Sequence, residues 1–128
     1  MLVVAGWGMG EDFVERFTEL QINDQTMGDR VVLRYLGYYD GGPVATGQLI
    51  YEHGVAGLYN ISTLDEFRRK GIGSAFTCML MDQARIDNLD WCILHASSMG
   101  KPIYEKIGFE TFCYIRYYDW TPNLTRNR

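Results

Sequence analysis

The clearest pattern in the chain is an apolar stripe with helical spacing that begins at Gly71. From there to about Asp87, apolar residues recur three, four, seven and eight positions apart, while charged residues occupy the other faces. The members of this stripe are Ile72, Ala75, Phe76, Met79, Leu80 and Ala84. A shorter pattern of the same kind over residues 11–21, with acidic residues in its first turn, predicts an amphipathic helix. The sequence therefore predicts a long helix packed on a sheet and a surface helix near the N-terminus.

Three runs of β-branched and aromatic residues lie between these two helices. The run 31–39 ends at a glycine-rich turn, and 44–53 reads as the returning strand of a hairpin. Gly54 separates that strand from a third run at 55–63. Residues 31–63 are therefore expected to form an antiparallel meander of three strands.

After the long helix, the chain alternates between strand and helix once more. Residues 91–96 fit a short buried strand, and a short helix with Pro102 near its start follows. Gly108 ends that helix, and residues 109–120 read as an extended, aromatic-rich strand. The expected order is α-β-β-β-α-β-α-β. This order predicts an α/β (α+β) fold with a mixed, mostly antiparallel central sheet flanked by helices.

Length, charge and hydropathy narrow the class of protein. The 128 residues, 47% of them hydrophobic, suit a single domain over 1–128, with a reduced N-terminal part at 1–30, a core at 31–120 and a polar tail at 121–128. The net charge of -4 argues against nucleic acid as a partner. The apolar start is too short to span a membrane, so we expect a cytoplasmic protein without a membrane partner.

The cysteines do not form a metal-binding pattern. Cys78, Cys92 and Cys113 are widely separated and lack the paired spacing of zinc ligands. We therefore expect reduced thiols and no metal.

A basic loop containing two glycines precedes the long helix and spans residues 68–74. Gly71 and Gly73 allow an anion to approach main-chain N–H groups at a helix N-terminus, where the neighbouring basic side chains can add charge-assisted bonds. The loop therefore predicts a site for a diphosphate. It lacks the GxxxxGK[ST] spacing of nucleoside triphosphatases, and Phe76 stands where a dinucleotide-binding loop has its third glycine. From the loop alone, a helix start without a ligand is the remaining alternative.

Two segments together resemble signatures of the GNAT superfamily of acetyl-CoA-dependent N-acetyltransferases. The first is a strand followed by R-x-x-G-x-G at a helix start, which spans residues 58–75. The second is Y-x-K-x-G-F at residues 104–109, a short helix that runs into the next strand. The two signatures occur in the family's order. The resemblance covers residues 31–120, where the expected order of elements is also similar to the GNAT fold.

The resemblance implies acetyl-CoA as the cosubstrate and an amine as the acceptor. The third and fourth strands would separate to admit the pantetheine arm, and an N–H near Ile61 would polarise the thioester carbonyl. The loop would bind the pyrophosphate, while two serines after the fourth strand would contact the arm or cap the next helix. The implied cofactor-binding residues are Ile61, Ser62, Thr63, Arg68, Arg69, Lys70, Gly71, Ile72, Gly73, Ser74, Ser97 and Ser98.

The resemblance also places a general acid at Tyr104. A phenol and an alkyl thiol differ in pKa by about two units, so a tyrosine can protonate a departing thiolate. The expected reaction is direct attack by a primary amine of a small molecule or peptide in a ternary complex, and the acidic surface favours cationic amines. The third strand carries no carboxylate, so the base is unassigned. Candidates that could act through water are Glu52, His53, His95 and Asp119.

Two other functions remain open on the sequence. The missing carboxylate and the short N-terminal part fit a non-catalytic acetyl-CoA sensor or interaction domain. The aromatic residues of 109–120 could also pair two copies of the chain, and such a homodimer is compatible with catalysis. Alternatively, alternate members of that strand pack into the core. These residues are Phe112, Tyr114, Tyr117, Tyr118 and Trp120.

Overall fold

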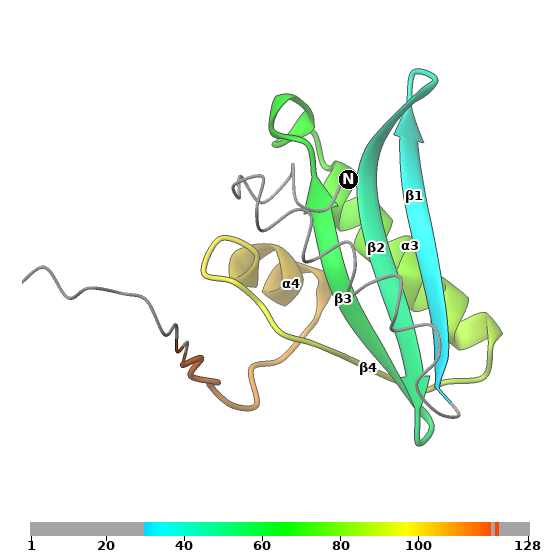
Figure 1. Cartoon of the computed structure of the whole chain (residues 1–128), viewed down its shortest axis with the longest axis vertical. Coiled ribbons are helices and arrows are strands. Elements are labelled where there is room, and N and C mark those ends of the chain that lie inside the picture. Colours follow the sequence, from blue (N-terminus) through cyan, green and yellow to red (C-terminus); the bar gives the residue numbers. More distant parts are fainter. Residues whose placement is uncertain (1–29, 119, 121–128) are drawn as a thin grey trace, which may run out of the picture.

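A four-stranded sheet with a long helix across one face forms the framework of the computed structural model, which describes residues 30–118 and 120 (Figure 1). The strands, in their order across the sheet, are β1 (Val31–Tyr39), β2 (Gly42–Glu52), β3 (Val55–Thr63) and β4 (Trp91–Leu94). The helices are the short 3-10 helix η2 (Asp65–Phe67), α3 (Ile72–Ile86) and α4 (Lys101–Ile107). The helix expected at 11–21 lies outside the described residues.

The pairing of the strands confirms the mixed sheet. β1 pairs with β2 and β2 pairs with β3, both antiparallel, so the expected meander of three strands is present. β4 pairs with β3 in parallel, after the crossover through α3.

None of the helices within residues 30–118 has the length and apolar character needed to cross a bilayer.

Helix α3 packs closely on the sheet because Gly47 of β2 has no side chain. A Cβ atom at Gly47 would lie 2.7 Å from Cε1 of Phe76 and 2.8 Å from Cδ1 of Leu80, both on the apolar stripe of the helix. Leu80 is fully buried and Phe76 is 8% exposed. This contact holds the first half of α3, and therefore the loop before it, against the middle of the sheet.

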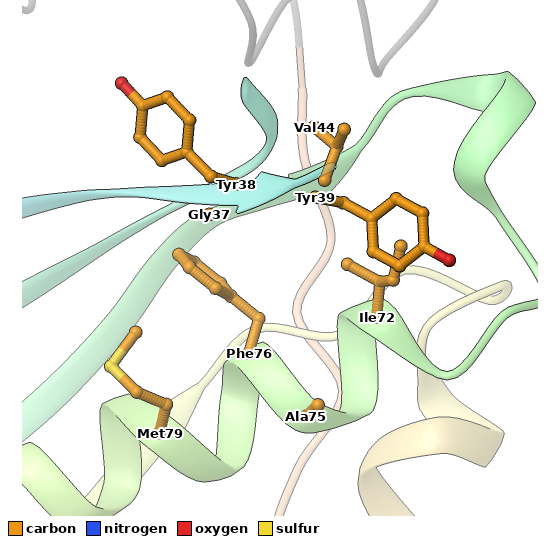
Figure 2. Close-up of a pocket in the computed structure, with 8 residues that line it drawn as sticks. All are labelled: Gly37, Tyr38, Tyr39, Val44, Ile72, Ala75, Phe76 and Met79. Carbon is orange, nitrogen blue, oxygen red and sulfur yellow. The ribbon is translucent and has the colours of Figure 1, made fainter. Parts of the chain in front are cut away.

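An apolar hollow lies where the end of β1 meets the first turns of α3. Figure 2 shows the Phe76 ring pointing from the helix toward the strand at Gly37, and the Tyr39 ring above Ile72. The hollow is lined by Gly37, Tyr38, Tyr39, Val44, Ile72, Ala75, Phe76 and Met79. It therefore lies on the β1 side of α3, whereas β3 and β4 flank the helix on the other side.

The expected strand at 109–120 is wrong, because residues 109–118 form no strand. Phe109 packs against the core cluster, but Phe112 and Tyr114 are 88% and 85% exposed. β-Propensity reflects packing against a neighbouring strand and a buried face, and these side chains have no such face. The expectation that alternate aromatic residues of this segment enter the core is wrong for the same reason, since Tyr117, Tyr118 and Trp120 are also exposed.

Candidate active site

An opening between β3 and β4 is the main irregularity of the sheet. Their pairing runs from Val55 and Trp91 to Leu58 and Leu94, where β4 ends. β3 continues to Thr63, while the chain leaves β4 at an angle to it and leads to α4 (Figure 1). One edge of β3 therefore lacks a strand partner beyond Leu58 within the described part of the chain.

A β-bulge bends β3 at the start of this opening. Gly47 of β2 lies opposite two residues of β3, Asn60 and Ile61, because the register shifts between Thr46 and Gln48. Asn60 has a φ of 54°, and its Nδ2 donates a 2.7 Å hydrogen bond to Oε1 of Gln48. Since a bulge adds one unpaired residue and increases the local twist, it turns the end of β3 relative to the rest of the sheet.

The main-chain groups of Ile61 and Thr63 point into the opening. The N–H of Leu64 donates to the carbonyl of Val44 on β2 at 2.9 Å. Main-chain groups alternate in direction along a strand, so those of Ile61 and Thr63 face away from β2. The Thr63 carbonyl accepts a 3.3 Å hydrogen bond from Nε of Arg68. The N–H groups of Ile61 and Thr63 therefore have no acceptor among the described residues and face the edge along which a ligand could bind.

The start of α3 adds a second set of amides. Gly71 has a φ of 77°, which turns the chain into the helix, and no side chain caps the helix. The first helical hydrogen bond runs from the N–H of Ala75 to the carbonyl of Gly71 at 3.0 Å. The amides of Ile72, Gly73 and Ser74 thus have no acceptor within the helix, as at any helix start. Such an N-terminus carries partial positive charge and binds anions.

The two sets of amides are adjacent. A Cβ atom at Gly73 would lie 3.6 Å from Oγ1 of Thr63, so the end of β3 touches the first turn of α3. Ser62 is 7% exposed, and its Oγ has no hydrogen-bond partner within the described residues. A buried hydroxyl without a partner is unfavourable unless a ligand or water satisfies it.

The basic residues of the loop differ in their surroundings. Arg68 forms an ion pair with Asp65 at 2.9 Å in addition to its bond to Thr63, so it fastens the loop to the end of β3. Nζ of Lys70 lies 5.0 Å from the centre of the Phe67 ring. Arg69 is exposed and has a φ of 61°. Arg69 and Lys70 thus directly precede the start of α3 and have no ion-pair partner among the described residues, whereas Asp65 offsets the charge of Arg68.

Ser97 stabilises the turn that leads into α4. Its Oγ accepts a 3.1 Å hydrogen bond from the N–H of Gly100, and its carbonyl accepts one from Lys101 at 2.9 Å. This bond lies in the turn before α4, whose N-cap is Gly100 with no side-chain cap, so the helix-capping role anticipated for one of the two serines is not formed. Ser98 is exposed.

Tyr104 is half-buried on α4. Its ring packs edge-on against Phe109, with 6.0 Å between the ring centres, and a Cβ atom at Gly100 would lie 2.9 Å from its Cε2. Burial raises the pKa of the Tyr104 phenol above 10.0. The phenol therefore stays protonated throughout the neutral range, as a proton donor must.

The four candidate bases differ in their position relative to the opening. Glu52 forms an ion pair with Arg30 at 3.2 Å, and His53 lies in the turn after it, at the opposite end of β3 from the opening. Asp119 lies outside the described residues. His95 directly follows β4 at the opening, and its ring meets Tyr59 of β3 and Tyr117. The contact with Tyr117 joins segments 22 residues apart, and the sequence carries no signal for it.

A metal site is not formed by the residues that the structure describes. No group of three or more histidine, cysteine, aspartate or glutamate side chains among them could hold an ion.

Comparisons with known proteins concern the family and the fold. Residues 32–111 match the family model of the acetyltransferase (GNAT) domain. An aminoglycoside 6'-N-acetyltransferase from Acinetobacter haemolyticus is similar in structure, with a TM-score of 0.61 and 19% identity, covering 82% of this chain and 81% of that one. A predicted acetyltransferase from Clostridium acetobutylicum, solved with acetyl-CoA, has a TM-score of 0.64 and 16% identity, covering 92% and 87%.

A third similar structure is glucosamine-6-phosphate N-acetyltransferase from Arabidopsis thaliana. Its TM-score is 0.55 and its identity 24%, covering 85% of this chain and 78% of that one. At such identities the likeness concerns the fold. A search of curated protein sequences gave no significant match.

Proposed function

Because the chain belongs to the GNAT acetyltransferase family, we propose that it transfers an acetyl group from acetyl-CoA to a primary amine of a small molecule or peptide. The observation that carries this proposal is the opening between β3 and β4, which adjoins the uncapped start of α3. Main-chain donors along one strand and a helix N-terminus beside it suit a ligand with amide groups and a diphosphate.

The residues of the opening fit coenzyme A in order along the chain. Ile61 and Thr63 offer main-chain groups to the amides of the pantetheine arm, in the manner of an added strand. The loop amides from Gly71 onward, with Arg69 and Lys70, would hold the pyrophosphate. The buried Oγ of Ser62 could then find a partner in the bound substrate.

Two groups of the chain would assist acyl transfer. The Ile61 N–H would polarise the thioester carbonyl, where negative charge develops during attack by the amine. Tyr104 would donate its proton to the departing thiolate sulfur. The raised pKa of Tyr104 keeps that proton in place. No side chain needs to form a covalent bond to the acetyl group when the amine attacks directly.

The acceptor class follows from charge alone. With a net charge of -4, the chain attracts cationic amines such as polyamines, aminoglycosides and basic peptide N-termini. The similar structure from Acinetobacter haemolyticus is an aminoglycoside acetyltransferase, so aminoglycosides belong in any test panel.

A second candidate function is a non-catalytic acetyl-CoA sensor. It is favoured by the composition of β3 beyond Leu58, where Tyr59, Asn60, Ile61, Ser62 and Thr63 include no carboxylate that could serve as a base. A sensor would bind the cosubstrate and leave its thioester intact.

Release of coenzyme A thiol from acetyl-CoA, measured with a panel of amines, tests the proposal. We expect release that depends on one class of amine, together with an acetylated product whose mass is higher by one acetyl group. Acetyl-CoA without amine is the control for hydrolysis. Calorimetric binding of acetyl-CoA without turnover over the whole panel would favour the sensor, and the absence of binding would contradict both functions.

A further inference from the structure

We propose that His95 is the general base of this site and that Tyr117 positions its ring. This inference rests on the proposed N-acetyltransferase activity, and it supplies the group that β3 lacks. Histidine is the side chain that most readily exchanges a proton near neutral pH. His95 is also the base candidate that the structure brings to the mouth of the opening, directly after β4 ends at Leu94.

The position of the ring is set from two sides. The His95 and Tyr59 rings pack edge-on, with 5.9 Å between their centres and 87° between their planes. Tyr59 follows Leu58, the last residue of β3 that pairs with β4. His95 and Tyr59 therefore stand together where the two strands separate, and Tyr59 precedes Ile61 by two residues on β3.

The contact with Tyr117 involves one of the two ring nitrogens, and we assign the other, Nε2, as the one that acts. The Tyr117 hydroxyl oxygen lies 3.1 Å from Nδ1 of His95. If that oxygen accepts from an Nδ1–H, the proton of the neutral ring is on Nδ1 and the lone pair is on Nε2. The His95 side chain is exposed, so its Nε2 can reach an amine bound at the opening.

The proton balance of the reaction is then complete. The amine lone pair forms the new C–N bond, Nε2 of His95 accepts the proton that the nitrogen loses, and the C–S bond breaks. The thiolate sulfur takes the proton of Tyr104. The products are an amide and a thiol, and solvent returns His95 to its neutral form and Tyr104 to its phenol.

The groups that face His95 are few within the described residues. They are Tyr59 from β3 and Tyr117 from the segment after α4. No aspartate or glutamate among the described residues forms an ion pair with the His95 ring. A pH dependence that disappears on replacement of His95 therefore reports the imidazole itself.

The test is the pH profile of kcat/KM for the full chain, measured by thiol release with the most active amine of the panel. We expect His95→Gln to lower kcat/KM at pH 7 by about 10² to 10⁴ and to remove a rate increase between acidic and neutral pH. The protonation of the amine substrate is common to all variants, so differences between profiles come from the protein. Affinity for acetyl-CoA, by calorimetry, should stay within about twofold of the wild type.

Two further variants sharpen the experiment. His53→Gln replaces the other histidine, whose side chain is 90% exposed in the β2–β3 turn, and should leave the profile unchanged. Tyr117→Phe removes the positioning contact. We expect it to lower kcat less than His95→Gln does and to change the acidic side of the pH profile. Added imidazole should partly restore His95→Ala. Wild-type activity in His95→Gln would overturn this inference alone, whereas no thiol release by the wild-type protein would overturn it together with the proposed function.

Discussion

The hydroxyl of Tyr51 on β2 donates a 2.6 Å hydrogen bond to Oδ2 of Asp87, the residue that ends α3. Gln83 donates a second bond to the same carboxylate at 3.2 Å. Together they lower the pKa of Asp87 below 3.8, and burial together with the bond to Asp87 raises the pKa of Tyr51. The C-terminal end of the helix is thereby fastened to the end of β2.

Stability should depend on pH through this pair. The folded pKa of Asp87 is lowered, so its contribution is complete at neutral pH and is lost as the pH falls through that pKa. We expect Tyr51→Phe to lower the urea midpoint at pH 7 and to narrow the difference between midpoints at pH 7 and pH 3. Tyr38→Phe, at an exposed position of β1, is the matched control. Equal pH dependence in Tyr51→Phe and wild type would contradict the assignment.

Gly47→Ala should destabilise the fold. The added methyl group would meet the Phe76 ring at 2.7 Å and the Leu80 side chain at 2.8 Å, so the helix would have to move away from the sheet. Overpacking of this kind costs about 1–3 kcal/mol in the free energy of unfolding. Gly42→Ala serves as the control, because a methyl group there has no neighbour closer than 3.9 Å. Urea denaturation of both variants distinguishes a packing effect from a general intolerance of alanine in β2.

Arg68 and Arg69 should respond differently to replacement by alanine. Arg68→Ala removes the ion pair with Asp65 and the bond to Thr63, so we expect both lower thermal stability and weaker acetyl-CoA binding. Arg69→Ala should weaken binding by about tenfold, through loss of a charge-assisted contact, while the melting temperature stays unchanged. Calorimetry and thermal melting on the two variants provide the comparison. Equal affinity of Arg69→Ala and wild type would exclude Arg69 from the pyrophosphate site.

Tyr104→Phe should separate catalysis from binding. The ring contact with Phe109 is retained, so the fold and the affinity for acetyl-CoA should persist, whereas loss of the proton donor should lower kcat by about 10² to 10⁴. Tyr114→Phe changes an 85% exposed tyrosine in the same way and should be inert. Because burial raises the pKa of Tyr104, ionisation of its phenol should not reduce kcat below pH 10. Unchanged turnover in Tyr104→Phe would remove this residue from the mechanism.

The homodimer stays a prediction, and the residues expected to form its interface are exposed. Five exposed aromatic residues of the segment after α4 could meet a second copy, since large apolar side chains gathered in one segment favour association. They are Phe112, Tyr114, Tyr117, Tyr118 and Trp120. Light scattering should give a molar mass of twice that of one chain. Phe112→Ser should lower the measured mass to that of a single chain. A monomer in the wild type at high concentration would contradict the prediction.

Local patterns were sufficient to predict most of the described fold. The apolar stripe from Ile72 to Ala84 identified α3, and turn residues separated β1, β2 and β3, because these signals depend on neighbours in sequence. Residues 109–120 were misassigned since their strand propensity depends on a buried face that the folded chain does not provide.

The candidate site was only partly predictable. The loop from Arg68 to Ser74 carries its own signal, in glycines and basic residues before a helix. The meeting of His95 with Tyr59 and Tyr117 depends on how distant segments pack. Likewise, the contacts of Arg68 with Asp65 and Thr63 depend on how the loop folds, and they give this expected phosphate ligand a second role as a support of the loop.

The edge of β3 from Tyr59 to Thr63, which has no strand partner among the described residues, has a consequence for aggregation. Bare strand edges are templates on which another molecule can add its own backbone, and this is a common beginning of aggregation. A pantetheine arm seated there would shield the template. The concentration of acetyl-CoA would then affect the solubility of the protein as well as its turnover. Protein without bound acetyl-CoA would aggregate more readily.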